Sequence, residues 1–350
     1  MIPVLMTQEN TAVENSLAWE SALSALPAHG GTLILPDGEL HHNGLELVSR
    51  QDVTVRGEGG RGLRTSLVCD DPRKSGLSVR DCKRITLSGF YSGHSVPSDQ
   101  TVGAISLHNF SDVTLDSLST WKGQMWGEVS NSYNGVVLFS DTVSGIIKVI
   151  NCTLNQHTGT GLYIQAPESG IIAELYIFDN VLMDNSGVGM QFVGTVAGVY
   201  VSRNSMWHNG TGIKSVRAYD IFLTENIVDS SINENFLAQN SHSGHLKANW
   251  FSWNENGVNV DVSGQIGDVV PIWEISDNIF LSKSGPGLRF GLYEARIHNN
   301  TIKGHGVQGP GIVLTESSKH VSVLLNWIKG HSPPIQDLGT SNVTNINSIF

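Results

Sequence analysis

The sequence predicts an all-β protein, a right-handed parallel β-helix with three short strands in each coil and one capping helix at the N-terminus. The first observation is a phrase centred on asparagine that recurs along the chain. The second is an alternation of apolar and polar residues around each asparagine, the period of a strand with one buried face. The third is the composition, because 38 glycines and only 15% charged residues are typical of a turn-rich β protein.

The N-terminal part of the chain lacks the repeat. A tryptophan and three leucines recur at helical spacing over residues 15–26, and Asn15 is a suitable N-cap. Residues 29–38, HGGTLILPDG, have the pattern of a turn, a strand and a second turn. We therefore expect residues 1–40 to form a cap, a helix followed by the first strand. Residues 41–350 should form the β-helix, whose first coil the cap would cover.

The repeat defines the coils of the β-helix. Its anchors are Asn151, Asn180, Asn204, Asn226, Asn249, Asn278, Asn300 and Asn326. Apolar residues stand three places before and two places after nearly every anchor, and a glycine-rich step then leads to another short strand. An asparagine at such a bend tolerates the left-handed backbone region, and its amide can bond a turn. Stacked coil on coil, the side-chain amides should form a ladder.

The opening phrase also carries a family resemblance. Gly30 and Gly31 precede a strand that ends in Pro36 and Gly38, and the asparagine-anchored coils follow. In this order the chain resembles the pectate-lyase-type β-helix superfamily, and within it phage tailspikes and polysaccharide depolymerases. The resemblance implies a carbohydrate-active homotrimer located on a virion or outside the cell. It transfers no catalytic residue.

Charge and cysteine content narrow the partners. The formal net charge of −11 argues against nucleic acid or an anionic membrane as the main partner. Three widely spaced cysteines form neither a disulfide framework nor a metal motif, and no nucleotide-binding motif is present. We therefore predict a polysaccharide or oligosaccharide partner, with no cofactor and no metal.

Outward positions of the coils supply the candidate binding residues. Four places before the anchors stand Tyr176, Tyr200 and Phe222 on successive coils, with Phe178 two residues from Tyr176. An exposed aromatic strip can bind sugar rings, form a subunit interface or simply pack. Further candidate contacts are Gln191 and Lys214 on the strands after the glycine-rich steps, and Trp126 and Glu128 in the longest departure from the repeat.

A second column supplies candidate catalytic residues. Asp179, Arg203 and Glu225 directly precede successive anchors, and Asp184 and His208 follow at turns. The column forms either a surface ion-pair stack or a carboxylate pair for glycoside hydrolysis. We favour hydrolysis by that pair. The alternatives are a lyase acting by β-elimination, with a lysine or arginine binding the substrate carboxylate, and a non-enzymatic spike or adhesin.

Overall fold

The computed structural model describes residues 1–58, 64–120, 129–264, 272–306 and 309–349, and these residues form a parallel β-solenoid with one short N-terminal helix. The predicted fold class is therefore confirmed. The chain divides into two compact units, unit 1 (Met1–Gly187) and unit 2 (Val188–Phe350). Residues 126 and 128, predicted to contact substrate, lie outside the described residues.

Unit 1 contains the helix and the first coils. Its described elements are α1 (Ala12–Ser24), β1 (Ile2–Pro3), β2 (Gly31–Leu35), β3 (Gly38–His42), β4 (Leu45–Val48), β5 (Gln51–Gly57), β6 (Thr65–Cys69), β7 (Leu77–Ser88), β8 (Tyr91–His94), β9 (Gly103–Asp116), β10 (Asn134–Phe139), β11 (Val143–Ile150), β12 (Leu162–Ala166), β13 (Ile171–Phe178) and β14 (Val181–Met183). In one row β1, β2, β5, β7, β9, β11 and β13 pair in parallel. The long strands β7 and β9 also join β4, β10 and β12 in a second row. Strands β3, β6 and β8 form a third.

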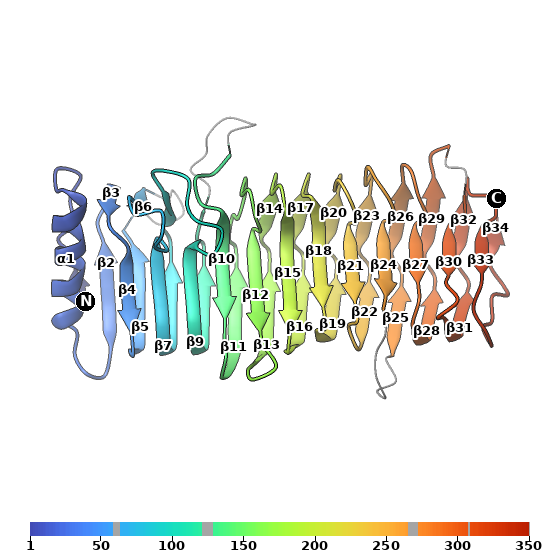
Figure 1. Cartoon of the computed structure of the whole chain (residues 1–350), viewed down its shortest axis with the longest axis horizontal. Helices are drawn as coiled ribbons and strands as arrows, with labels where there is room; N and C mark the ends of the chain where they lie inside the picture. The colour runs from blue at the N-terminus through green and yellow to red at the C-terminus, as the bar shows by residue number, and fades with distance from the viewer. Residues whose placement is uncertain (59–63, 121–128, 265–271, 307–308, 350) are drawn as a thin grey trace. The chain divides into compact units, whose positions relative to one another are not determined.

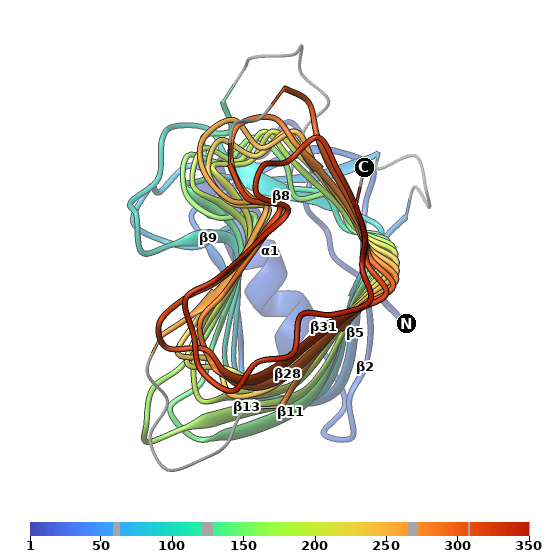
Figure 2. The same ribbon diagram turned by 90° about the vertical axis from the view of Figure 1, so that its right-hand side faces the viewer.

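Unit 2 repeats this arrangement more regularly. Its described strands are β15 (Val188–Gly194), β16 (Val196–Ser202), β17 (Ser205–Trp207), β18 (Thr211–Val216), β19 (Tyr219–Thr224), β20 (Ile227–Asp229), β21 (Phe236–Gln239), β22 (Gly244–Lys247), β23 (Trp250–Ser252), β24 (Val260–Ser263), β25 (Trp273–Ser276), β26 (Ile279–Ser282), β27 (Leu288–Phe290), β28 (Tyr293–His298), β29 (Thr301–Gly304), β30 (Ile312–Leu314), β31 (Lys319–Leu324), β32 (Trp327–Lys329), β33 (Ile335–Asp337) and β34 (Ser348–Ile349). We call β16, β19, β22, β25, β28 and β31 the first row of unit 2. The second row runs from β15 through β18, β21, β24, β27 and β30 to β33, and the third from β17 through β20, β23, β26, β29 and β32 to β34. End-on, β28 and β31 lie on the same side of the coils (Figure 2).

Helix α1 lies beside β3 and β4 in unit 1 (Figure 1). It begins earlier than predicted, because Thr11 is the N-cap and forms a capping box with Glu14. Asn15 is instead a buried residue inside the helix, and its amide donates to the carbonyl oxygens of Thr7 and His41 at 3.0 and 2.9 Å. Trp19 is buried as expected, whereas Leu17 is 57% exposed, so the helix buries only part of its predicted apolar face.

The predicted asparagine ladder is present in unit 2. Asn226 donates its side-chain amide to Oδ1 of Asn249 at 3.0 Å, and its main-chain N–H donates to the same oxygen at 3.0 Å. Its amide also donates to the carbonyl of Val201 on the coil before, at 2.9 Å. The same pattern recurs at the later anchors, and all of them are buried. Each rung therefore satisfies polar groups that the core would otherwise leave unpaired.

Two details of the predicted anchor column are wrong. The left-handed residue is not the asparagine but the residue before it, as Glu225 with φ 57° and Asp277 with φ 59° illustrate. The first anchor is also displaced by one place, because Val149 pairs with Ile177 and the N–H of Cys152 donates to Oδ1 of Asn180. Cys152, not Asn151, therefore occupies the rung. The lysine three places before Asn151, in an otherwise apolar column, is the sign of this slip.

Inward side chains of the strands form the core of each unit. Leucine, isoleucine, valine and phenylalanine alternate inward along the strands and are almost fully buried. This burial supplies the main driving force for stacking the coils. Among the described residues, no helix has the length and apolar character that a membrane crossing requires.

Candidate functional site

The first row of unit 2 presents an outward column of side chains. Phe222, His245, Glu274, Arg296 and Ser322 are consecutive register partners on β19, β22, β25, β28 and β31. Strands in such a row lie about 4.8 Å apart, so each side chain directly neighbours the next. We call these five residues the floor.

A second column runs two residues before the floor on the same face. Its members are Asp220, Ser243, Ile272, Glu294 and His320. We call these five residues the rim. Asp220, Glu294 and His320 have positive φ angles of 51°, 47° and 58°, a backbone region that costs non-glycine residues energy. The same backbone region recurs at turns along the described chain, Asp179 and Glu225 included, so here it marks a local bend in these three strands.

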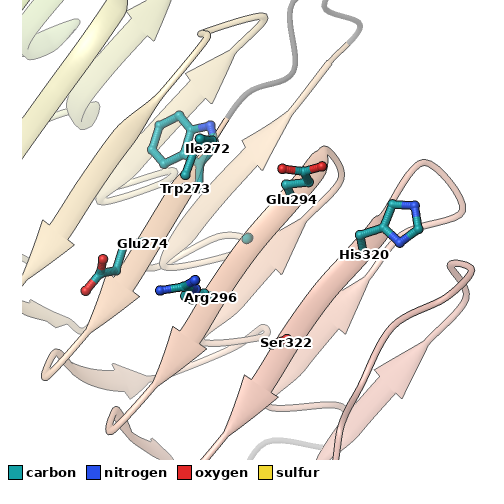
Figure 3. Close-up of a pocket in the computed structure, with 8 residues that line it drawn as sticks. Ile272, Trp273, Glu274, Glu294, Arg296, His320 and Ser322 are labelled. Carbon is teal, nitrogen blue, oxygen red and sulfur yellow. The ribbon is translucent and has the colours of Figure 1, made fainter.

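Floor and rim line two adjoining hollows that share Ile272. One, of about 390 Å³, is lined by residues of β25, β28 and β31, among them Glu274, Glu294 and Arg296 (Figure 3). The other, of about 320 Å³, lies over β19 and β22 and is lined by Asp220, Phe222 and neighbouring histidines. Each is within the range of ligand pockets, roughly 300–1,000 Å³. We call the two adjoining hollows together the groove.

Stacked rings form one end of the groove. Tyr200 stacks on Phe222 with centroids 4.9 Å apart and planes 7° apart, and Phe222 stacks on His245 at 5.1 Å. Beside them Tyr219 stacks on His242 at 4.2 Å. Burial lowers the pKa of His242 although Asp220 opposes the shift, which favours the neutral ring. This end therefore offers the flat faces of stacked rings, with the Asp220 carboxylate beside them.

Charged groups occupy the other end. The Glu274 carboxylate lies between two imidazoles, 3.9 Å from Nδ1 of His245 and 3.6 Å from Nε2 of His298. Arg296 is its register partner on β28, and Glu294 lies two residues before Arg296 on the same strand (Figure 3). Two carboxylates, a guanidinium and the imidazole of His320 thus line one hollow. This composition suits proton transfer to or from a bound molecule.

The floor is shaped by a glycine. A Cβ on Gly244 would lie 2.4 Å from Cζ3 of Trp273, its register partner on β25. Trp273 is fully buried, so its indole occupies the space that any other residue at position 244 would need. Gly244 therefore lets the strands approach closely beneath the hollow of Phe222 and Asp220.

The predicted catalytic residues lie at bends between consecutive strands, which we call corners. Asp179, Arg203 and Glu225 are exposed and directly precede ladder positions, with φ angles of 59°, 56° and 57°. Asp184 and His208 occupy a second corner, with φ angles of 56° and 51°. None of the five lines the groove. The corner geometry accounts for the column without catalysis, and a catalytic role for these residues stays a prediction.

The predicted binding residues divide between the two units. Tyr200 and Phe222 belong to the aromatic end of the groove in unit 2. Tyr176 and Phe178 pair edge to face in unit 1 with centroids 6.1 Å apart, and the Tyr176 hydroxyl donates to Glu174 at 2.8 Å. Gln191 and Lys214 are register partners in the second row of unit 2, away from the groove strands.

The rim is the part of the groove that the sequence pattern did not reveal. Its members stand six places before the anchors, a position from which no candidate residue was predicted. Asp220, Glu294 and His320 share this spacing, so the column six places before the anchors was the available signal. The floor residues Glu274 and Arg296 share a column with Tyr200 and Phe222, whose aromatic character singled them out instead.

Solved structures with the same fold span nearly the whole chain. They include a mutant DFA-IIIase from Arthrobacter chlorophenolicus A6 in complex with DFA-III (12% identity, TM-score 0.63, covering 99% of this chain and 98% of that one). A family 28 exopolygalacturonase from Yersinia enterocolitica matches with 10% identity and a TM-score of 0.57 over 99% of this chain and 77% of its own. A mutant of the periplasmic alginate epimerase AlgG matches with 11% identity and a TM-score of 0.53 over 93% and 80%.

These likenesses define the class of the protein as a right-handed parallel β-helix, as the sequence predicted. No curated protein matches the sequence significantly. The chain belongs to the NosD family, described as periplasmic copper-binding protein, whose profile matches residues 155–346.

The family description raises the question of a copper site. In the described residues, no three histidine, cysteine or acidic side chains are grouped as a metal-ligand set. The cysteines are buried and free, and burial raises the pKa of Cys69 to about 11 and that of Cys152 to about 12. Thiolates, which bind soft metals, are therefore disfavoured at both positions. The described residues do not fit a copper ion, and we derive no chemistry from one.

Proposed function

We propose that the protein binds an oligosaccharide or polysaccharide along the groove and hydrolyses it with Glu274 and Glu294. The observation that carries this proposal is the continuity of the aromatic end with the carboxylate end across five neighbouring strands. The likeness to β-helix proteins titled as a DFA-IIIase and an exopolygalacturonase supports the carbohydrate class.

Binding uses the aromatic end. The stacked rings of Phe222 and His245 present an apolar face to a sugar ring, and the Ser243 and Asp220 oxygens beside them can accept hydrogen bonds from hydroxyl groups. Pockets of this kind combine apolar faces with a few placed polar groups, which fix the orientation of the ligand.

Hydrolysis uses the carboxylate end. Glu274, held between two imidazoles, acts as the base that takes a proton from water. Glu294, on the exposed rim, donates its proton to the leaving glycosidic oxygen. The bond from the anomeric carbon to that oxygen breaks while the water oxygen bonds to the same carbon. Glu274 ends protonated and Glu294 ionised, and solvent restores both.

The Cα spacing of the two residues leaves room for a water molecule between their side chains, as inversion at the anomeric carbon requires. Glu294 lies on the strand next to Glu274 and two residues off its register. One strand spacing combined with two residues of rise separates their Cα atoms by roughly 8 Å. Inverting enzymes hold their carboxyl groups roughly 6.5–9.5 Å apart, whereas retaining enzymes hold them closer.

The test is a panel of neutral, amino-sugar and acidic polysaccharides incubated with the protein. New reducing ends indicate hydrolysis, and ultraviolet absorbance of an unsaturated product indicates elimination. We expect reducing ends, lost by at least about a hundredfold in Glu274→Gln and Glu294→Gln. The Asp179→Asn and Glu225→Gln variants are matched controls that test the pair predicted from sequence.

Each alternative has its own outcome. Activity lost in Glu225→Gln but kept in Glu274→Gln would place the catalytic pair at the corners. An unsaturated product would make the protein a lyase. Binding without turnover, weakened by Phe222→Ala, would support a non-enzymatic adhesin or spike.

We further propose a periplasmic or extracellular location, supported by the description of the family as periplasmic. Fractionation of cells with antibody detection tests this. The predicted virion location and homotrimer remain predictions, and sedimentation equilibrium of the purified chain measures the oligomeric state.

A further inference from the structure

We infer that the groove selects glycans without carboxylate groups and that its acidic rim excludes chains of uronic acids. This inference rests on the proposed function and adds the chemical class of the substrate. It would set the chain apart from fold neighbours titled for polygalacturonate and alginate, both of which are polymers of uronic acids.

The charge of the groove carries the inference. Its described lining contains three carboxylates, those of Asp220, Glu274 and Glu294, and one guanidinium, that of Arg296. With neutral histidines the formal sum is −2 when all three carboxylates are ionised, and −1 when Glu294 carries the proton that it donates in hydrolysis. The whole chain has the same sign, with a formal net charge of −11. Both the local and the long-range field therefore oppose an approaching polyanion.

Arg296 is the one residue in this lining suited to binding a substrate carboxylate. It is the register partner of Glu274, so their Cα atoms are about 4.8 Å apart across β25 and β28. Glu294 lies two residues earlier on the same strand and lines the same hollow. A sugar carboxylate that approached Arg296 would therefore also approach two glutamates. The net field at this point disfavours it, and the guanidinium remains available to hydroxyl oxygens.

Asp220 extends the same selection to the aromatic end. Its carboxylate is exposed and accepts a hydrogen bond from the Ser243 hydroxyl at 2.5 Å, which fixes its position on the rim. A sugar stacked on Phe222 therefore meets a negative charge on one side. Bringing like charges together in a binding site lowers the affinity enough to determine specificity. Repulsion of acidic glycans can therefore select neutral glycans as effectively as favourable contacts to the neutral ones.

Asp220 lies in the other hollow from the proposed catalytic pair. Its substitution therefore tests the selection of substrate without removing a catalytic carboxylate. The Asp220→Asn variant removes the charge and keeps one oxygen as an acceptor, so its readout is the ratio of affinities for the charged and uncharged forms of one ligand. Asp277→Asn is the matched control, because Asp277 is an exposed acid of the same unit that lines neither hollow.

The experiment compares pairs of ligands that differ only in charge. Oligogalacturonides and alginate oligosaccharides are each used alongside their carboxyl-reduced forms, in which a hydroxymethyl group replaces each carboxylate. Binding is measured by calorimetry at low salt and at about pH 8, where an ordinary imidazole is uncharged. Wild-type protein should bind at least one reduced form about tenfold or more tightly than its acidic parent.

The variants and salt then identify the cause. Asp220→Asn and Glu294→Gln should each reduce, by severalfold, the difference in affinity between the reduced and the acidic form of a ligand. Asp277→Asn should leave this difference unchanged. Added salt should reduce it in every protein, because salt screens the charges. Equal or tighter binding of the acidic forms would overturn the inference while leaving a carbohydrate function intact. If neither these ligands nor the polysaccharide panel bind, the proposed function itself fails and the inference fails with it.

Discussion

Oδ1 of Asn300 accepts two hydrogen bonds from Asn278, one from the side-chain amide and one from the main-chain N–H, both at 3.0 Å. The Asn300 amide in turn donates to the carbonyl of Ile275 at 2.8 Å. One side chain therefore satisfies three polar groups of the preceding coil. Because the rung is buried, these polar groups cannot form hydrogen bonds to water. The Asn300 side chain provides the hydrogen bonds that they would otherwise lack.

Replacing Asn300 by alanine should lower the free energy of unfolding by about 3 kcal/mol or more. The change leaves two buried donors of Asn278 without their acceptor, and each unsatisfied group costs roughly 1–3 kcal/mol. Chemical denaturation measures the loss. Asn345→Ala removes an exposed asparagine of the same unit and should shift the transition by less than about 0.5 kcal/mol. Equal effects of the two variants would contradict the ladder.

Cys152 occupies a ladder position where the other coils have asparagine, so introducing an asparagine there should be tolerated. The Cys152 N–H already donates to Oδ1 of Asn180, and its Sγ lies 3.7 Å from the carbonyl oxygen of Leu115. Cys152→Asn would place an amide where it can donate to both oxygens, so we expect stability to be kept or raised by about 1 kcal/mol. Cys152→Asp cannot donate to them and should destabilise unit 1. A marked loss of stability in the asparagine variant would refute the placement of Cys152 on the rung.

Buried imidazoles predict acid sensitivity. Burial is the main cause that lowers the pKa of His42 to about 3 and that of His157 to about 4, from the ordinary value of 6.5. In the unfolded chain both groups take up protons as the pH falls below 6.5, whereas in the folded protein they do not until about pH 3 and about pH 4. Stability is therefore complete above pH 6.5 and falls below it, by about 1.4 kcal/mol per pH unit for each group.

Denaturant unfolding between about pH 8 and about pH 4 measures this slope. His157→Gln should flatten it, at the cost of some stability at the alkaline end because the bonds to Thr120 and Ser132 are disturbed. His320→Gln replaces an exposed imidazole of unit 2 and should leave the slope unchanged. A stability that does not change with pH over this interval would exclude the buried neutral rings.

Truncation of Phe222 to alanine should weaken glycan binding about tenfold with little change in the turnover of bound substrate. The ring stacks between Tyr200 and His245, and aromatic contacts of this kind contribute about 0.5–1.5 kcal/mol beyond their buried area. Calorimetry and saturation kinetics separate the two effects. Phe178→Ala, which alters a ring of unit 1, is the comparison. If Phe178→Ala weakens binding as much as Phe222→Ala, the binding surface also includes unit 1.

Replacing Gly244 by alanine should lower the free energy of unfolding, although it adds only a single methyl group. The new Cβ would lie 2.4 Å from Cζ3 of the fully buried Trp273, so the strand or the indole must move. Overpacking of this kind costs about 1–3 kcal/mol. Thermal unfolding measures the loss. Gly145→Ala, at a strand position where the new Cβ would meet nothing nearer than 3.5 Å, tests whether any glycine change on a strand has the same effect.

Much of the fold could be predicted because the ladder imposes a period on the sequence. Asn226, Asn249 and Asn278 must recur wherever a coil closes, so their spacing reveals the coils before any strand is assigned. The register was lost where the rung residue is a cysteine, since a thiol has no amide to signal its place. The N-cap was missed because Asn15, a typical capping residue, is used inside the helix to bond the loop before it and the strand after it.

The site was harder to predict for a different reason. Corner residues such as Asp179 and Glu225 are polar because a left-handed turn exposes them, so they produce a charged column with no need of a ligand. Asp220 and Glu294 lie within strands but are left-handed too, with φ angles of 51° and 47°. Sequence alone does not distinguish the two cases, because the period is the same for both.

The ladder also separates the length of a coil from its alignment. The rungs at Asn249 and Asn278 are 29 residues apart and those at Asn278 and Asn300 only 22, yet both pairs make the same hydrogen bonds. Residues can therefore be gained or lost at the turns without disturbing the column above or below. Because the ladder keeps the coils aligned, the loop of a single coil can change its length independently of the others. Such exchanges would alter the walls of the groove without altering the strands beneath it.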